Sequence, residues 1–460
     1  MTSIVDLLIE AIGKDAVLAP IEAAERPASR WLSTNYLSCK ALARPSTTND
    51  VAAILQICHQ HNQTVVPHGG LTNVVGGVTT TPNDVALSLE RMNVIEEIDL
   101  QNKTVTVQAG VILHDLQKVV AEAGLLFPLD LGAKGSCMIG GNISTNAGGL
   151  QAIRYGVMRQ LVLGLEVVLA DGTVISSMNK MLKNNAGYDL KHLFIGSEGT
   201  LGVVTKAILK LEDAPKSKNT ALIGLSSFGK AIEFLQTAKR ELANKLTTFE
   251  IIWQDYYGLM TTPPSSFAPP LPQNYPYYVL MEALGQNEQN DEIHFQHLLE
   301  QCLEKSLIED AALAKSQQEL DCFWGIREKV DFVFQVHQPV FLFDVSLPIT
   351  EMENYIQTII QDLKAVWPHV HFYSFGHMGD GNLHLFVSCG ENTPETRHRV
   401  EEIVFLPLQK IGGSITAEHG IGLEKKPWLH LSRTPEEIAL MRTLKQALDP
   451  KGILNPGKVV

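Results

Sequence analysis

Two histidines, His377 and His384, stand seven positions apart on either side of a Gly-Asp-Gly turn. The residues before and after this turn have the composition of β-strands, so a hairpin can bring both imidazoles to one point. A glutamate and a histidine, Glu418 and His419, follow later in the chain. Two histidines with one carboxylate are a common ligand set for a borderline divalent ion and leave positions open for a substrate. A histidine pair with this spacing also occurs as hydrogen-bonded structure, so the residues alone leave both interpretations open.

Glycine gathers in two segments that could hold a pyrophosphate. One spans residues 67–73, directly after a short β-rich run, and the other spans residues 128–149. Glycines allow backbone N–H groups to converge on anionic oxygens, and Ser136, Thr145 and Asn146 would add neutral hydrogen bonds. Neither segment has the GxGxxG spacing of a dinucleotide-binding fold or the pattern of a Walker loop. A cofactor cradle and turn-rich β-structure therefore both remain open at this point.

The composition sets the broad class of the protein. The chain has 460 residues, 45% hydrophobic and 19% charged, which predicts about two or three globular domains. Its formal net charge of −13, without a basic run, argues against nucleic acid or an anionic membrane surface as a partner. No apolar run approaches the length of a membrane span. The six cysteines are scattered and form no CxxC pair, which predicts reduced thiols. The N-terminus is acidic where a secretory signal would be basic. Together these features predict a cytoplasmic location.

Local patterns predict an α+β protein. Glycine-rich turns separate short strands up to about residue 211, and strands alternate with helices from about residue 219. Residues 261–276 contain six prolines and are expected to form an irregular surface loop, with a lid or a partner-docking loop as the alternative. The segments expected as strands are 64–66, 84–88, 104–109, 163–169, 203–209, 221–225, 248–253, 277–283, 371–375 and 383–388. The segments expected as helices are 3–13, 48–62, 114–123, 230–243, 291–305 and one within the last 40 residues or so.

Three strings carry a family resemblance: PLDLGAKGSCMIGGNISTNAGG, LGLEVVLADGTV and GYDLKHLFIGSEGTLGVVT. Together with the GHMGDGNLH and EHG segments, they resemble the vanillyl-alcohol-oxidase-type FAD flavoproteins, most closely the D-2-hydroxyacid dehydrogenases. The resemblance covers almost the whole chain. It implies an α+β fold with a two-subdomain FAD-binding domain at residues 1–215 and a substrate-binding cap domain with the metal site at residues 216–420. A C-terminal helical segment at residues 421–460 would return to the flavin.

The resemblance places FAD contacts in the two glycine-rich segments, at a later Gly-Val pair and at a C-terminal asparagine. Some relatives attach FAD through a histidine directly after the first Gly-Gly pair. Here that position is Leu71, so non-covalent FAD is expected, and His68 is expected to be a structural loop histidine. The expected contacts are Pro67, Gly69, Gly70, Leu71, Thr72, Asn73, Pro128, Leu129, Gly132, Gly135, Ser136, Ile139, Gly140, Gly141, Asn142, Thr145, Asn146, Gly148, Gly149, Gly202, Val203 and Asn455.

The resemblance also gives roles to the polar residues of the second half. It implies that His377, His384 and Glu418 bind a divalent metal, zinc or manganese, and that His419 contacts the substrate and acts as general base. Arg327 would bind the substrate carboxylate, for which its planar fork is suited. The expected reaction takes a 2-hydroxy acid to the 2-keto acid, with hydride transfer to flavin N5. The D configuration is implied by the family.

Three positions bear on the substrate side chain. Hydroxyglutarate-specific relatives have a threonine, a lysine and an asparagine where this chain has Asp331, Leu342 and Phe386. Asp331 lies four residues after Arg327 and could pair with it on one helix, whereas Phe386 shares a strand face with His384. These residues predict a small or apolar, D-lactate-like side chain. The alternative is that all three lie outside the pocket.

Several alternatives remain open at the level of sequence. One is a D-2-hydroxyglutarate dehydrogenase, and another is an FAD oxidase of glycolate or other 2-hydroxy acids that uses O2. A flavin-binding subunit without enzymatic activity would predict a broken metal and base set, which the intact motifs oppose. The sequence does not distinguish an electron-transfer flavoprotein, a quinone or a cytochrome as electron acceptor. It also leaves open whether the chain forms a homodimer.

Overall fold

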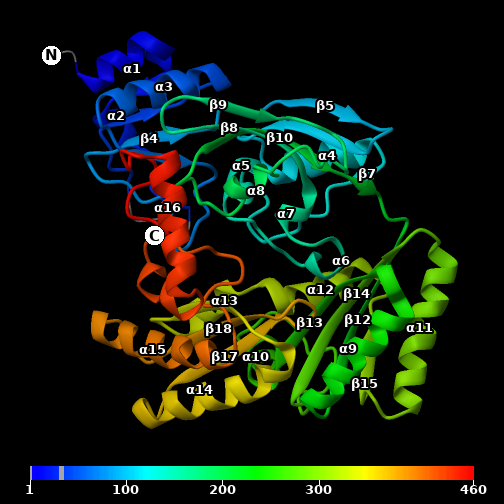
Figure 1. Cartoon of the computed structure of the whole chain (residues 1–460). Coiled ribbons are helices and arrows are strands. Elements are labelled where there is room, and N and C mark those ends of the chain that lie inside the picture. Colours follow the sequence, from blue (N-terminus) through cyan, green and yellow to red (C-terminus); the bar gives the residue numbers. More distant parts are fainter. Residues whose placement is uncertain (1–2, 31–35) are drawn as a thin grey trace. The chain divides into compact units, whose positions relative to one another are not determined.

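The computed structural model describes residues 3–30 and 36–460. The chain forms two compact units (Figure 1). Unit 1 contains Met1–Gly149, Gly156–Ala214 and Glu418–Val460, and unit 2 contains Leu150–Tyr155 and Pro215–Ala417. The chain passes from unit 1 to unit 2 between residues 214 and 215 and returns between residues 417 and 418. The domain boundaries expected from the sequence were 215/216 and 420/421, so they differ by one and three residues. Residues 150–155 also belong to unit 2, which the sequence did not indicate.

Unit 1 is built on two sheets. The first has the strand order β1–β2–β4–β3, with β2, β4 and β3 parallel and the short β1 antiparallel to β2. The second is antiparallel, with the order β5–β6–β10–β8–β9. The strands of the first sheet are β1 (Val17–Leu18), β2 (Ala41–Ala43), β3 (Val65–His68) and β4 (Val85–Ser88). Those of the second are β5 (Ile95–Asp99), β6 (Thr104–Gln108), β8 (Val162–Val168), β9 (Val174–Ser177) and β10 (Val203–Lys210).

Helix α3 (Thr48–Gln60) crosses from β2 to β3, as the parallel pairing requires. Its start is fixed by a capping box, because Thr47 Oγ1 accepts from the Asp50 N–H at 3.1 Å and the Asp50 carboxylate accepts from the Thr47 N–H at 3.0 Å. The other elements of unit 1 are α1 (Ile4–Ile12), η1 (Lys14–Ala16), α2 (Pro20–Ala23), α4 (Leu113–Glu122), β7 (Leu125–Leu126), α5 (Ile139–Ser144), α7 (Met158–Leu161), α8 (Lys191–Phe194), β11 (Glu212–Asp213), η4 (Lys426–Leu431) and α16 (Pro435–Leu448).

Unit 2 is built on one seven-stranded antiparallel sheet, with the order β15–β12–β14–β13–β17–β18–β16. Its strands are β12 (Ser217–Leu225), β13 (Leu246–Trp253), β14 (Tyr277–Gly285), β15 (Asp310–Leu313), β16 (Phe341–Ser346), β17 (His371–His377) and β18 (Asn382–Ser388). Its helices are α6 (Ala152–Tyr155), α9 (Phe228–Leu242), η2 (Ala243–Lys245), α10 (Gln254–Thr261), α11 (Glu288–Glu304), α12 (Gln317–Glu328), α13 (Asp331–Val336), η3 (Ile349–Glu351), α14 (Met352–Val366) and α15 (Pro394–Lys410).

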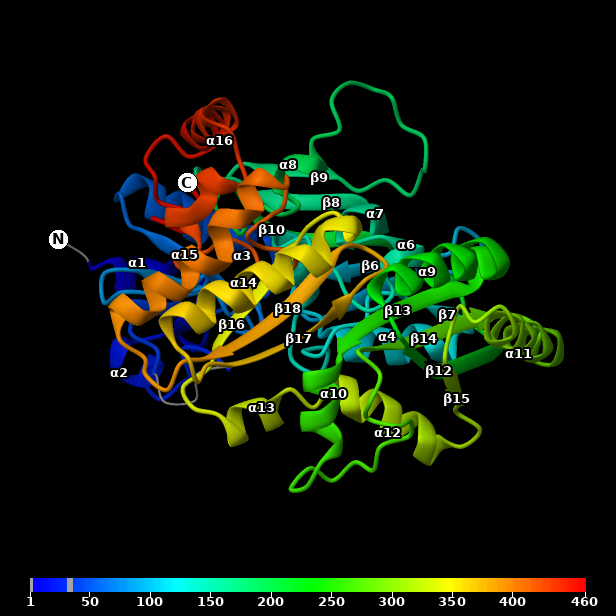
Figure 2. The same cartoon turned by 90° about the horizontal axis from the view of Figure 1, so that it is seen from below.

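Helices cover both faces of this sheet. Helices α10, α12 and α13 gather along one face (Figure 2), and α9, α11, α14 and α15 pack on the other. The central strand β14 shows the result, because every residue in it is buried. Tyr278 stacks on Tyr257 of α10 at 3.7 Å between ring centroids, whereas its neighbour Tyr277 meets Phe228 of α9 at 5.6 Å. Alternate side chains of one strand therefore belong to two different cores.

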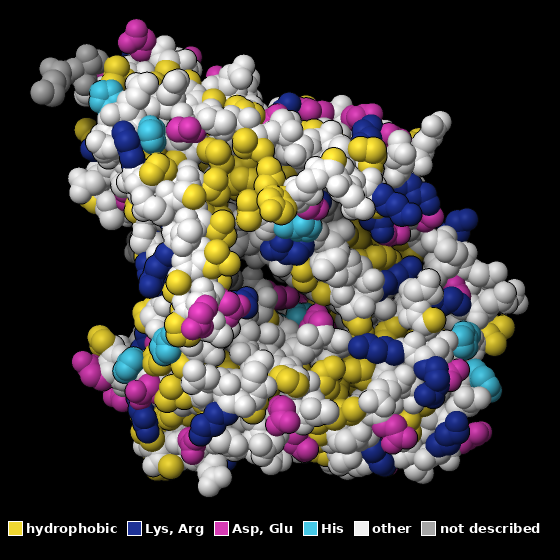
Figure 3. All heavy atoms as spheres, viewed as in Figure 1, with side chains coloured by type: hydrophobic (Ala, Val, Ile, Leu, Met, Phe, Trp, Pro, Cys, Tyr) yellow, Lys and Arg dark blue, Asp and Glu magenta, His cyan; other side chains and the backbone are white. Residues whose placement is uncertain are grey.

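The expected α+β class is confirmed, and each strand and helix expected from the sequence is present within a few residues. The proline-rich segment is irregular, but it is not simply a surface loop: Leu271 is buried, and its N–H donates to the Tyr257 hydroxyl at 3.0 Å. Among residues 3–30 and 36–460, no helix combines the length and apolar character that a membrane span requires. Basic and acidic side chains are interspersed on the face shown in Figure 3, in keeping with the absence of a basic run in the sequence.

Candidate active site

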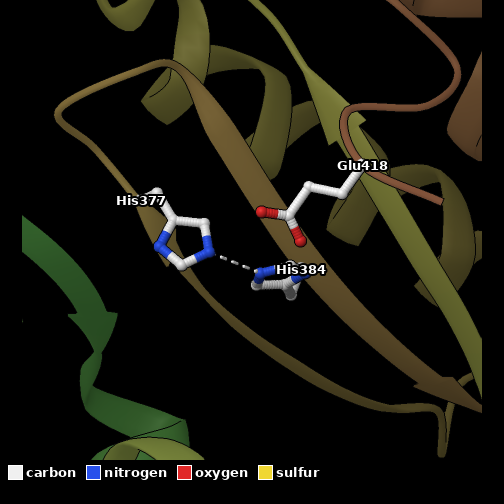
Figure 4. Close-up of side chains that lie close together, drawn as sticks. All are labelled: His377, His384 and Glu418. Carbon is white, nitrogen blue, oxygen red and sulfur yellow. Dashed lines mark hydrogen bonds between the residues drawn. The ribbon is translucent and has the colours of Figure 1, made fainter. Parts of the chain in front are cut away.

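Three of the expected site residues lie together in the structure. His377, His384 and Glu418 each present one ligand atom, and these atoms lie within 4.8 Å of one another (Figure 4). The hairpin of β17 and β18 brings the two imidazoles together, with 3.3 Å between their Nε2 atoms. Glu418 directly follows Ala417, whose N–H donates to Asp344 Oδ2 on β16 at 3.1 Å. The chain leading to Glu418 is thus held by the edge strand of the same sheet.

A buried carboxylate fixes the tautomer of His377. Glu250 on β13 lies opposite His377 in the strand register, and its Oε1 lies 2.5 Å from His377 Nδ1. Burial alone would raise the pKa of Glu250, but the charges of Arg327 and His377 lower it to about 2. The group is therefore a carboxylate and can only accept. His377 Nδ1 must carry the proton, which leaves the Nε2 lone pair for a metal.

Asp344 has the corresponding place beside His384. It is fully buried, it lies opposite His384 in the register of β16 and β18, and its Oδ1 is 3.9 Å from His384 Nδ1. The nearby negative charge favours the His384 tautomer with the proton on Nδ1, which would turn a second Nε2 lone pair toward His377. The two Nε2 atoms lie 3.3 Å apart as a hydrogen-bonded pair whose donor is set by the tautomer, and a cation could take the place of the shared proton. The donor set of two imidazoles and a carboxylate therefore fits a divalent ion such as zinc or manganese.

Arg327 lies at the C-terminal end of α12, 6% exposed. Its Nε donates to Glu250 Oε2 at 2.6 Å, and its guanidinium lies 4.2 Å from the centre of the Phe375 ring. Its side chain makes no other hydrogen bond to the residues that the structure describes. Both Nη groups therefore remain to bind a carboxylate bidentately.

The expected pairing of Arg327 with Asp331 is wrong. Helix α12 ends at Glu328, Lys329 leaves the helical conformation with ψ 51°, and α13 begins at Asp331. An i, i+4 contact requires one continuous helix, and the break removes it. Arg327 turns instead to the buried carboxylate of Glu250, and Asp331 is exposed. A direct contact between Asp331 and the substrate stays a prediction.

Apolar side chains flank His384 on the same face of the sheet. Phe386, 2% exposed, packs against Phe375 with 5.5 Å between ring centroids, and Phe375 lies 5.2 Å from the ring of His384. Leu342 on β16 is the cross-strand partner of Phe386. Phe334 of α13 closes this group from the helical side, at 5.9 Å from Phe386.

The two glycine-rich segments of unit 1 lie against each other. A Cβ at Gly70 would come within 2.0 Å of the Ser136 carbonyl oxygen, and one at Gly69 would lie 3.7 Å from the Gly141 backbone. Only glycine allows the approach at Gly70. Gly135 and Gly141 have no atom within 4 Å of the position of a Cβ, so their backbone faces open space. This arrangement fits a pyrophosphate bound by backbone N–H groups.

The C-terminal asparagine also fits a flavin ligand. Asn455 is buried, and its Nδ2 donates to the carbonyl oxygens of Gly77 at 3.1 Å and Glu198 at 2.7 Å. Its Oδ1 is buried without a hydrogen-bond partner among the described residues. Such an atom is costly unless a ligand or water satisfies it.

Leu71 and His68 stand on either side of the first glycine pair. Leu71 has a left-handed backbone with φ +58° and carries no nucleophile. His68 is not a loop residue, since it ends β3 in a buried position with its Nε2 2.9 Å from the Val78 carbonyl oxygen. Burial lowers its pKa to about 4, so it is neutral at pH 7. The remaining expected FAD residues also lie in unit 1: Pro67, Thr72, Asn73, Pro128, Leu129, Gly132, Ile139, Gly140, Asn142, Thr145, Asn146, Gly148, Gly149, Gly202 and Val203.

A half-buried glutamate, Glu198, holds the segment that follows the expected general base. Glu198 accepts from the Ile421 N–H at 2.7 Å and the Gly422 N–H at 2.9 Å, and Asn73 Nδ2 donates to the His419 carbonyl oxygen at 3.4 Å. Glu198 was not among the residues singled out from the sequence, and neither were Glu250 and Asp344. The available signal for the last two was a carboxylate inside an apolar strand, which is rare unless it is paired.

Comparisons with known proteins agree with this division of the chain. Residues 39–177 match a family model described as an FAD binding domain, and residues 214–459 match the C-terminal domain of FAD linked oxidases. The chain is 39% identical to the mitochondrial D-2-hydroxyglutarate dehydrogenase of Bos taurus, over 98% of this chain and 82% of that protein. It is 38% identical to the mitochondrial enzyme of the same name from Arabidopsis thaliana, over 98% and 80%. It is 34% identical to the D-2-hydroxyglutarate–pyruvate transhydrogenase DLD3 of Saccharomyces cerevisiae, over 94% and 88%.

Solved structures confirm the vanillyl-alcohol-oxidase-type fold. Alkyldihydroxyacetonephosphate synthase superposes with a TM-score of 0.78 at 19% identity, over 99% of this chain and 86% of that one. p-Cresol methylhydroxylase superposes with a TM-score of 0.75 at 15% identity, over 99% and 96%.

The expected cytoplasmic location is wrong by these comparisons, since similar relatives from cattle, zebrafish and Arabidopsis are named as mitochondrial. The six cysteines are all free thiols, and free thiols fit any compartment that keeps them reduced.

We predict that acid or heat precipitation releases FAD into the supernatant, because Leu71 cannot form a bond to the flavin. The absorbance of supernatant and pellet measures this directly. A pellet that keeps its yellow colour after washing would contradict the expectation.

We also predict that prolonged chelation removes a divalent ion while the flavin spectrum persists, because none of His377, His384 and Glu418 is among the residues expected to bind FAD. The stripped protein should rebind about one Zn²⁺ or Mn²⁺ per chain in a calorimetric titration. In His384→Ala the affinity should fall by at least about 10–100-fold, the range for loss of even an outer-shell partner. A stripped wild-type protein that binds neither ion would exclude the metal site.

Proposed function

Because the chain belongs to the FAD-linked oxidases, among the FAD-dependent D-2-hydroxyglutarate and D-lactate dehydrogenases, we propose that it oxidises a D-2-hydroxy acid to the 2-keto acid with the help of a divalent metal. The observation that carries the metal dependence is the convergence of two imidazole Nε2 atoms and the Glu418 carboxylate. A second observation supports the substrate class: Arg327, with both Nη groups available, is joined to the same cluster through Glu250.

The two groups that this chain would bind supply complementary chemistry. The glycine-rich segments would hold FAD, which would supply the acceptor for the hydride that leaves C2 of the substrate. His377, His384 and Glu418 would hold the metal, which would supply the Lewis acidity that eases loss of the hydroxyl proton.

The side chains of the protein position the substrate and move its proton. Arg327 binds the carboxylate through its Nη groups, which fixes the orientation of C2. His419 accepts the hydroxyl proton as general base. It directly follows Glu418, and Asn73 and Glu198 hold the backbone of this segment. The hydroxyl loses a proton to His419 and C2 loses a hydride, so two electrons and two hydrogens leave the substrate.

We propose a substrate with a small or apolar side chain. Support comes from Phe386, Phe375 and Leu342, which form a packed apolar layer beside His384. A second carboxylate buried against these groups would lose its hydration without gaining a partner, at a cost of several kcal/mol. The positive charge of Arg327 is already balanced by Glu250. D-2-hydroxyglutarate remains the second candidate, because the names of the cattle and Arabidopsis relatives favour it.

We predict that His419→Ala retains FAD and metal but loses about 10²–10⁴-fold in kcat, the range for removal of a general base. His430→Ala is the matched control, because His430 is exposed on η4. Anaerobic flavin reduction in single-turnover mixing measures the step directly. A His419 variant within a few-fold of the wild type would assign the base to another residue.

We predict that kcat/KM for D-lactate, D-2-hydroxybutyrate or a longer apolar D-2-hydroxy acid exceeds that for D-2-hydroxyglutarate by at least about tenfold, the effect of about 1.4 kcal/mol of unpaired charge. A dye-reduction assay with D and L forms, with and without added zinc or manganese, gives the comparison. A tenfold preference for D-2-hydroxyglutarate would establish the second candidate instead.

A further inference from the structure

One buried carboxylate bonds to two residues with separate tasks in the proposed reaction. Glu250 has no exposed surface, and it hydrogen-bonds His377, an expected metal ligand, and Arg327, the expected carboxylate-binding residue. We propose that Glu250 is a positioning residue that orients both side chains at once and so ties the geometry of carboxylate capture to that of the metal ligand. This inference rests on the function proposed above.

The arrangement comes from two directions in the fold. Strand β13 carries Glu250 opposite His377 of β17, whereas α12 brings Arg327 onto the same face of the sheet. Each carboxylate oxygen has its own partner, with Oε1 2.5 Å from His377 Nδ1 and Oε2 2.6 Å from Arg327 Nε. Both partners are 6% exposed, so water competes little for these bonds.

The two hydrogen bonds set the orientation of the groups on the far side of each partner. Because Nδ1 of His377 donates to Glu250, its Nε2 is an acceptor directed to His384 Nε2, 3.3 Å away. Because Nε of Arg327 donates to the same carboxylate, the guanidinium plane is fixed above Phe375. The end-on pair of N–H bonds, one from each Nη, then points away from the Nε edge that faces Glu250.

A purely structural ion pair in the same sheet offers a comparison. Glu282 on β14 is 3% exposed, pairs with Lys218 at 3.0 Å and accepts from the Thr220 hydroxyl at 3.1 Å. Neither partner belongs to the site, and Lys218 is half-exposed. Glu282 is therefore the matched control for loss of a buried negative charge in this sheet.

Glu250→Gln should disturb the site in a defined way. Its amide has the shape of the carboxylate but offers one acceptor and one donor instead of two acceptors. If the NH2 faces Arg327 Nε, two donors meet and the guanidinium must move. If it faces His377, Nδ1 must become an acceptor, and the proton moves to Nε2, where the metal would bind.

The test is a calorimetric titration of Zn²⁺ into metal-stripped protein that retains FAD. For Glu250→Gln we expect an affinity about 10–100-fold below the wild type, the range for loss of a partner that orients a metal ligand. Glu282→Gln should stay within twofold. At saturating Zn²⁺, Glu250→Gln should also raise KM for D-lactate by about tenfold, because Arg327 is no longer aligned. A Glu250→Gln protein that binds Zn²⁺ within twofold of the wild type would overturn the proposal.

Glu250→Asp separates position from charge. It keeps a negative charge beside Arg327, which protects folding, but it is one methylene shorter and cannot reach both partners. We expect a Zn²⁺ affinity about tenfold below the wild type, at the lower end of the same range, whereas an unchanged affinity would show that charge alone matters and would overturn the proposal. Wild-type protein that binds no Zn²⁺ or oxidises no D-2-hydroxy acid would instead refute the proposed function itself. Wild-type binding and turnover together with unaltered Glu250 variants would remove only the positioning role.

Discussion

A negative charge without contact to water governs the architecture of unit 2. The Glu250 carboxylate has no exposed surface, and an isolated buried charge costs far more than a small domain can tolerate. The carboxylate can be buried only because Arg327 and His377 pair with it. The position of α12, which carries Arg327, and the register of β13 against β17, which carries His377, are therefore both tied to this charge. The two hydrogen bonds that compensate the buried charge also orient Arg327 and His377, the two residues with expected roles in the site.

Coverage of both sheet faces provides the setting for this charge. Tyr256 of α10 lies 4.5 Å from the Phe375 ring, and Phe375 lies beneath the Arg327 guanidinium. Aromatic groups exclude water, and hydrogen bonds between charged groups are stronger where the surroundings are less polarisable. The polar row formed by Glu250, His377 and His384 is therefore embedded in an apolar layer, which favours fixed geometry over mobility.

The sequence was informative where the chemistry is local along the chain. His377 and His384 belong to one hairpin, and the glycine-rich segments carry their pattern in consecutive residues, so both could be recognised from spacing. Glu250 lies 127 positions from His377, and no short-range pattern distinguishes it from other carboxylates. The expected pairing of Arg327 with Asp331 failed because the i, i+4 spacing assumed one continuous helix, whereas α12 ends at Glu328 and α13 begins at Asp331. Helix α10 was not foreseen, because short apolar runs do not reveal their type until neighbours are known.

The edge position of β16 has a consequence for folding fidelity. This strand pairs with β18 alone among the strands of its sheet, and a slip by one residue would exchange its two faces. With β16 shifted in this way against β18, the apolar Phe343 or Val345 would lie opposite His384. Asp344 would lose Asn382 Nδ2 and the Ala417 N–H, its partners at 2.7 and 3.1 Å. The unpaired Asp344 carboxylate would then lie on the face of β16 where Phe343 now packs against Phe405 of α15, with 5.4 Å between the ring centroids. Burial of the Asp344 charge therefore makes a shifted register of β16 costly, independently of any ligand.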